Sequence, residues 1–133
     1  MALITSNLPD LTLLSTGKVR DIYKSSRSDS LLFVASDRIS AFDVILKNGI
    51  PDKGKLLTKI SLFWFGVLKD VIPNHIITAD IDEMPEEVHK YKDQLEGRAM
   101  LVKKAKVVPI EAIVRGYITG QTWRIALHRC SHS

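Results

Sequence analysis

The stretch Gly17-Lys18-Val19-Arg20-Asp21-Ile22-Tyr23, followed closely by Leu31-Leu32-Phe33-Val34-Ala35, decides the fold at the start of this chain. Val19 to Tyr23 and Leu31 to Ala35 are short runs of strand-forming residues, and the stretch between them, Lys24 to Ser30, is polar. This pattern predicts a β-hairpin with a longer loop. Gly17 stands immediately before the first of these strands.

Further along the chain, the spacing of apolar residues changes from that of a strand to that of a helix. Between Lys55 and Val71 they recur at steps of three and four, which places them on one helix face. Pro73 lacks a backbone N–H and does not easily continue a helix. We expect this apolar face to pack in the core, and Trp64 to fill space there rather than stack on a ligand. The face consists of Leu56, Ile60, Phe63, Trp64, Val67, Leu68 and Val71.

The remaining expected elements are short. Asp80 to Glu96 is acidic and predicts a loop with a short helix from Glu86 to Leu95. Met100 to Lys104 predicts a strand, and Ile110 to Val114 one more. Short strands around one main amphipathic helix predict an α+β fold with a mostly antiparallel sheet.

Length and composition limit the class of protein. A chain of 133 residues, 45% hydrophobic and 26% charged, is typical of a single globular domain. Its longest strongly apolar stretch, Ile60 to Leu68, is shorter than the roughly 20 apolar residues that span a bilayer. The first ten residues show no secretory signal, and the single cysteine, Cys130, fits a reducing compartment. We therefore expect a cytoplasmic protein with no membrane partner.

Charge is unevenly distributed along the chain. Residues 98–133 carry seven Lys or Arg and one acid, Glu111, for a net charge of +6, whereas residues 1–97 carry a net charge of −2. Such a basic segment attracts nucleic acid or phosphorylated small molecules, or forms a plain solvated surface. Because the basic residues are scattered and no nucleic-acid-binding motif accompanies them, we expect no nucleic acid partner.

Two stretches place cations beside predicted strands. At Gly17-Lys18-Val19-Arg20 the glycine lets backbone amides approach a phosphate, and the two cations neutralise it. The spacing is not that of a Walker loop, and a turn glycine before a charged edge strand explains the same residues. In the strand from Met100, one lysine of the Lys103-Lys104 pair faces the same side as Met100, where burial would require an anion. On an edge strand both lysines would simply be solvated.

The stretch Ser36-Asp37-Arg38-Ile39-Ser40-Ala41-Phe42-Asp43 follows a predicted strand, a common place for functional groups. Arg38 offers a bidentate grip on a carboxylate or phosphate, and Ser40 and Asp43 offer hydrogen bonds. The structural alternative is a capped turn, with Asp37 or Ser40 as the cap.

The stretch from Val108 to Gly120 combines the isolated acid Glu111 with Arg115 and two glycine-containing turns. A fixed positive charge and exposed turn amides suit an oxyanion or phosphate. The structural alternative is an ion pair between Glu111 and Arg115. The spacing of His128, Cys130 and His132 matches none of the usual zinc patterns, so we expect no metal site there.

Taken together, these stretches resemble the phosphoribosylaminoimidazole-succinocarboxamide synthases, a family also called the SAICAR synthetases. Four motifs occur in the order of that family, and the resemblance extends from about Gly17 to Trp123. The motifs are Gly17 to Tyr23, Ser36 to Asp43, Lys53 to Phe65 and Ile110 to Gly120.

The resemblance implies the N-terminal nucleotide lobe of an ATP-grasp-related fold over residues 1–114. Residues 115–133 would then begin a second domain, with an atypical tail from about residue 124. Members of the family use ATP and Mg²⁺ to join carboxyaminoimidazole ribonucleotide (CAIR) to L-aspartate in purine biosynthesis. Their metal-binding acids are expected outside this chain, which we therefore predict to be inactive alone. The alternative is a nucleotide-binding or interaction module without catalysis.

The resemblance also assigns residue roles. It implies that ATP contacts Gly17, Lys18, Val19, Arg20, Lys104 (or, as second choice, Lys103) and Glu111. It implies that the ribonucleotide substrate contacts Arg38, Ser40, Asp43, Arg115, Gly120 and Gln121. At Gln121 the family normally has serine, whose hydroxyl helps to bind the substrate phosphate, so a longer amide side chain would take that place.

Overall fold

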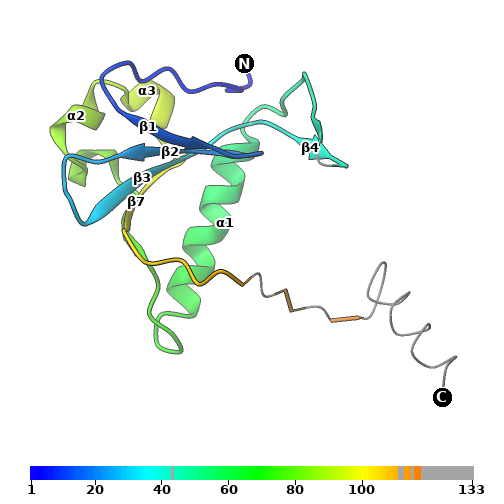
Figure 1. Ribbon diagram of the computed structural model, residues 1–133, viewed down its shortest axis with the longest axis vertical. Coiled ribbons are helices and arrows are strands. Elements are labelled where there is room, and N and C mark those ends of the chain that lie inside the picture. The colour runs from blue at the N-terminus through cyan, green and yellow to red at the C-terminus, as the bar shows by residue number, and fades with distance from the viewer. Residues whose placement is uncertain (43, 111–112, 115, 118–133) are drawn as a thin grey trace, which may run out of the picture.

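The computed structural model describes residues 1–42, 44–110, 113–114 and 116–117. Within them, a five-stranded antiparallel sheet has the order β1-β2-β3-β7-β6 (Figure 1). Its strands are β1 (Leu13–Thr16), β2 (Arg20–Lys24), β3 (Ser30–Ala35), β7 (Ala99–Lys103) and β6 (Ile76–Thr78). A separate two-stranded hairpin consists of β4 (Ser40–Ala41) and β5 (Val44–Ile45). The predicted α+β fold with a mostly antiparallel sheet is confirmed.

The predicted hairpin is present as β2 and β3. Its register pairs Arg20 with Ala35 at one end and Lys24 with Leu31 at the other. The predicted strand from Met100 is present as β7, one residue earlier than expected. The sequence did not predict β1, because all four of its residues are exposed and show no apolar alternation. Only its pairing with β2 makes it a strand.

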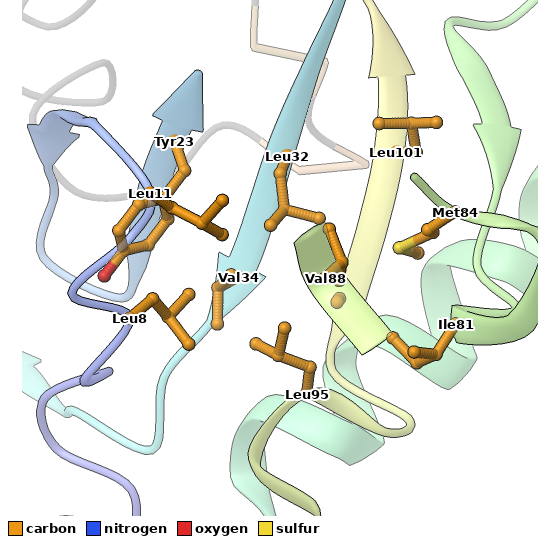
Figure 2. Close-up of a cluster of buried hydrophobic side chains, with 11 residues drawn as sticks. Leu8, Leu11, Tyr23, Leu32, Val34, Ile81, Met84, Val88, Leu95 and Leu101 are labelled. Atoms are coloured by element: carbon orange, nitrogen blue, oxygen red, sulfur yellow. The ribbon is translucent and has the colours of Figure 1, made fainter. Parts of the chain in front are cut away.

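The main core lies on one face of the sheet. Leu32 and Val34 of β3 and Leu101 of β7 point to this face, where Val88 and Leu95 pack against them (Figure 2). Burying each such side chain contributes about 1.5–3 kcal/mol. The covering segments are the N-terminal stretch, a 3-10 helix η1 (Ile81–Glu83), α2 (Glu86–His89) and α3 (Lys92–Leu95). The expected helix from Glu86 to Leu95 is therefore two short helices, separated where the Tyr91 N–H bonds to the Val88 carbonyl.

The long helix α1 (Lys53–Val67) lies on the other face of the sheet (Figure 1). The predicted orientation of this helix is wrong, since Gly54 and Thr58 are its buried residues, whereas Trp64 is 52% and Phe63 62% exposed. The reason is close packing against the sheet: a Cβ at Gly54 would lie 2.5 Å from the Ala35 carbonyl oxygen. The small side of the helix therefore approaches the strand, and the large apolar side faces outward.

Two other expectations concern chain segments at the edges of the fold. The helix ends at Val67 rather than Val71, and the next amide, Leu68 N–H, caps it by bonding to the Trp64 carbonyl. No strand includes Ile110, Ile113 or Val114, and the two residues between Ile110 and Ile113 lie outside the described part.

Among the helices of the described ranges, none has the length and apolar character needed to cross a membrane.

Candidate functional site

The turn between β1 and β2 contains the first predicted site. The Gly17 N–H donates to the Arg20 carbonyl at 2.7 Å, which closes the turn. A side chain at Gly17 would be crowded, because a Cβ there would lie 3.3 Å from the same carbonyl oxygen. The Val19 carbonyl accepts a hydrogen bond of 2.9 Å from the Ser36 N–H, so the turn is attached to the loop that follows β3. Gly17, Lys18, Val19 and Arg20 therefore form one compact, exposed turn.

Arg38 lies beneath this turn and is 5% exposed. Its Nη2 donates to the Gly17 carbonyl at 2.9 Å and to Asp21 Oδ1 at 2.7 Å. Its Nη1 donates to the Ile4 carbonyl at 2.7 Å and to Asp21 Oδ2 at 3.3 Å. The guanidinium thus directs these four hydrogen bonds into the protein. Contact with substrate stays a prediction for Arg38. In the structure its buried guanidinium links the Gly17 turn to Asp21 and to the Ile4 carbonyl.

Asp21, the partner of Arg38, is a residue to which the sequence assigned no role. Burial raises the pKa of its carboxyl, but hydrogen bonds from Arg38 and Ser6 and the positive charge of Arg38 outweigh this effect. The pKa of Asp21 therefore lies below its ordinary value. The pair is charged at neutral pH, and the bidentate geometry fixes the orientation of the guanidinium plane.

A second buried pair stands beside the first. Asp37 is fully buried, and its Oδ1 accepts hydrogen bonds from Arg98 Nη1 at 2.9 Å and from the Gly54 N–H at 2.8 Å. Its Oδ2 accepts another from the Leu3 N–H at 2.8 Å. Burial raises the pKa of this carboxyl, and these donors together with the Arg98 charge lower it below its ordinary value. The structural alternative placed Asp37 as the cap of its own turn, whereas these hydrogen bonds reach distant segments, among them the first turn of α1.

Arg20 and Lys104 are found at opposite ends of the sheet. The Arg20 guanidinium stacks over the Phe33 ring at 5.1 Å, on the α1 side. Lys104 directly follows β7, and its N–H donates to the Asp29 carbonyl at 2.7 Å. In the sheet, Lys103 pairs with Ser30 at one end of β3, and Arg20 pairs with Ala35 at the other end. The length of β3 therefore separates Arg20 from the end of β7 by about 16 Å. Both Lys103 and Lys104 are exposed, although β7 lies between β3 and β6 and is not the edge strand that the solvated alternative assumed.

The remaining predicted residues fall in two groups. Ser40 is half-buried in β4, and the hairpin of β4 and β5 projects beyond the sheet (Figure 1). The other predicted site residues lie outside the described residues, and they are Asp43, Glu111, Arg115, Gly120 and Gln121. His128, Cys130 and His132 lie outside them as well. In the described part of the chain, no three His, Cys, Asp or Glu side chains are grouped so that they could hold a metal ion.

A small cavity lies beside the turn, between the sheet and α1. Its volume is about 30 Å³, and Arg20, Thr58 and Met100 are among the residues that line it. A space of that size has room for about one water molecule, whereas ligand pockets usually measure about 300–1,000 Å³. A nucleotide at the turn would therefore lie on an open surface of the described residues.

Comparison with known proteins identifies relatives over almost the whole chain. The family model described as SAICAR synthetase matches residues 13–132, a wider range than the sequence motifs span. The phosphoribosylaminoimidazole-succinocarboxamide synthase of Maridesulfovibrio salexigens is 59% identical over 121 residues, which cover 91% of this chain and 40% of the relative. The enzyme of the same name from Pichia angusta is 59% identical over 120 residues, which cover 86% and 39%.

The fold agrees with these relatives. The solved structure named "SAICAR-synthase from Saccharomyces cerevisiae complexed SAICAR" superimposes with a TM-score of 0.87 at 47% identity, over 96% of this chain and 45% of that one. The chain thus spans about two fifths of the length of the relatives that it matches. With a family match over most of its residues and relatives more than half identical, the chain belongs to the SAICAR synthetase family.

Proposed function

We propose that this chain supplies the nucleotide-binding part of an enzyme that joins L-aspartate to CAIR in the cytoplasm, forming SAICAR for purine biosynthesis. In the proposed reaction the CAIR carboxylate accepts the terminal phosphoryl group of ATP. The amino group of aspartate then attacks the acyl carbon and displaces phosphate. A C–N bond forms, and ADP and phosphate are released. The observation that carries this proposal is the close family match, which includes every motif assigned above.

The turn from Gly17 to Arg20 has the chemistry that phosphate groups require. It is exposed, it carries the cations Lys18 and Arg20, and its backbone is held by hydrogen bonds to buried groups. Phosphoryl transfer needs positioning and charge stabilisation more than a covalent enzyme nucleophile. We therefore assign Gly17, Lys18, Val19 and Arg20 to the phosphates of ATP.

Lys104 and Glu111 are assigned to a different part of the nucleotide. The separation of about 16 Å between Arg20 and the end of β7 prevents one phosphate from contacting both sites. A nucleotide extended between these two sites would place its phosphates at the turn and its nucleoside towards Lys104. Ser40, Asp43, Arg115, Gly120 and Gln121 are assigned to CAIR.

The metal ligands for Mg²⁺ are proposed to come from outside this chain, in agreement with its coverage of about two fifths of its relatives. Residues 1–114 would form the nucleotide lobe. Residues 115–133 would begin the second domain, with the atypical tail from about residue 124. This arrangement predicts nucleotide binding without turnover by the chain alone.

Calorimetric titration of the 133-residue chain with Mg-ATP, combined with an assay for SAICAR, tests this proposal. We expect saturable binding and no product when CAIR, aspartate and Mg-ATP are supplied together. Rapid product formation would overturn the assignment of the metal ligands to residues outside the chain. Absence of nucleotide binding would overturn the assignment of the turn.

The second candidate is an interaction module without catalysis, and the exposed apolar side of α1 favours it. Leu56, Ile60, Phe63 and Trp64 line a surface cavity of about 390 Å³ on this helix. Exposed apolar patches of this kind mark association sites. Sedimentation velocity over a range of concentrations tests the idea, and a monomer at every concentration with no affinity for Mg-ATP would exclude this module.

A further inference from the structure

We infer that Arg38 is a positioning residue, which holds the Gly17 turn in the form that presents a backbone N–H to a phosphate. The inference rests on the proposed nucleotide binding at this turn, and it assigns Arg38 a role different from direct contact with substrate. It is carried by the hydrogen bond of 2.9 Å from Arg38 Nη2 to the Gly17 carbonyl.

The buried surroundings hold Arg38 in one orientation. Asp21 accepts hydrogen bonds from both of its terminal nitrogens, and the Ile4 carbonyl accepts another. Asp21 is held in turn by the Ser6 hydroxyl, which donates to its Oδ2 at 2.8 Å. With its plane fixed from two sides, the guanidinium presents Nη2 to the turn at a constant position.

The planarity of the peptide bond transmits this orientation to the outer surface of the turn. The C=O and N–H of a trans peptide point in opposite directions, and the described residues contain no cis peptide. Because the Gly17 carbonyl faces the buried guanidinium, the N–H of the same peptide unit, that of Lys18, is directed away from it. The Ser36 N–H holds the Val19 carbonyl in the same turn. Loss of Arg38 would let the Gly17–Lys18 peptide rotate and turn a carbonyl oxygen towards the phosphate.

Arg98 provides a matched control within the same fold. It is as deeply buried as Arg38 and also forms a buried ion pair, in which its Nη1 contacts Asp37 Oδ1. Within the described ranges, its side chain makes polar contacts with Asp37, Asp52 and the Ala35 carbonyl, and none of these residues is in the turn. A substitution at Arg98 therefore weakens a buried ion pair without releasing the Gly17 carbonyl.

The test compares R38K and R98K in the 133-residue chain by calorimetric titration with Mg-ATP, at a temperature where circular dichroism shows both variants folded. A lysine keeps the charge but cannot bridge Asp21 and the Gly17 carbonyl with the planar fork of arginine. We expect R38K to lose about tenfold in affinity for Mg-ATP, as for a lost charge-assisted hydrogen bond. We expect R98K to bind as the unaltered chain does. Equal affinities for R38K and R98K, whether both are reduced or both unchanged, would overturn the positioning role.

Amide NMR of the unaltered chain gives a second measurement that does not depend on whether R38K folds. On addition of inorganic tripolyphosphate, the Lys18 amide signal should shift, whereas that of Gln94 in α3 should not. An unmoved Lys18 signal in a chain that binds Mg-ATP would overturn the inference and leave the nucleotide site in place. A chain that binds neither ligand would overturn both proposals.

Discussion

The backbone N–H of Gly54 donates a hydrogen bond of 2.8 Å to the carboxylate of Asp37. This bond joins the loop that follows the central strand β3 to the first turn of α1. It supplies a partner for a helix N–H that otherwise has none within the helix. The same carboxylate accepts from Arg98 and from the Leu3 N–H, so three segments that are distant in sequence meet at one buried charge.

Glycine at position 54 is required by the approach of helix and strand. In G54A the new Cβ would lie 2.5 Å from the Ala35 carbonyl oxygen. We expect the free energy of unfolding to fall by about 1–3 kcal/mol, as in other overpacked sites. G66A in the same helix is the control, because a Cβ there meets no atom within 4 Å. It should raise stability by about 0.4–1 kcal/mol. Urea denaturation measures both, and equal effects would contradict the close packing of α1.

The two sides of the fold should respond differently to truncation of apolar residues. Leu32 is 1% exposed in the core, so L32A should lower the free energy of unfolding by about 2–5 kcal/mol. Phe63 is 62% exposed on α1, so F63A should change it by no more than about 0.5 kcal/mol. Chemical denaturation at two protein concentrations checks this. If F63A instead loses much of its free energy of unfolding, and loses more at the higher protein concentration, this side of α1 is covered by association between chains.

Stability should depend on pH through the two buried carboxylates. The pKa values of Asp21 and Asp37 in the folded chain lie below the ordinary value of 3.8, so the unfolded chain binds more protons in acid. The stabilisation is complete above the unfolded pKa and is lost as pH falls through the lower folded values. Urea midpoints between pH 7 and pH 2.5 measure the decrease.

Replacing one of these carboxylates should reduce that acid sensitivity. D37N removes one titrating group, so its urea midpoint should fall less steeply between pH 5 and pH 2.5, although its stability at neutral pH is lower. D29N is the control, because Asp29 is 66% exposed in its ion pair with Arg27. An unchanged slope in D37N would show that Asp37 does not carry the acid response.

The two ends of the proposed nucleotide site can be tested separately. K18A and K104A should each weaken Mg-ATP binding about two- to fivefold, because an exposed charge contributes about 0.2–1 kcal/mol. K18A should lose less affinity for adenosine than for Mg-ATP, since Lys18 is assigned to the phosphates. Calorimetric titrations in low and high salt measure these effects, with K69A, two residues after the end of α1, as the control. An equal loss of Mg-ATP affinity in K69A would show that the net charge of the chain, and not contact with Lys18 or Lys104, causes the effect.

Local patterns in the sequence determined several elements of this protein. Alternating and apolar runs predicted β2, β3 and β7, and the spacing of apolar residues predicted most of α1. The same is true of family membership, because the motifs around Gly17, Arg38 and Arg115 are contiguous and need no tertiary contact to be recognised. These features depend on residues close together in the chain, and the preferences involved are properties of short segments.

Tertiary structure alone decided the orientation of α1 and the hydrogen-bond partners of Arg38. The spacing of apolar residues identified an apolar side of the helix. Which side meets the sheet depends instead on the close approach of Gly54 to the Ala35 carbonyl, where a larger side chain would not fit. Similarly, an arginine at position 38 predicted a residue that binds a carboxylate or phosphate. Its acceptors, Asp21 and the carbonyls of Ile4 and Gly17, come from segments that only folding brings together. Packing distance and buried hydrogen bonding are relations between segments, so they arise only when the chain is folded.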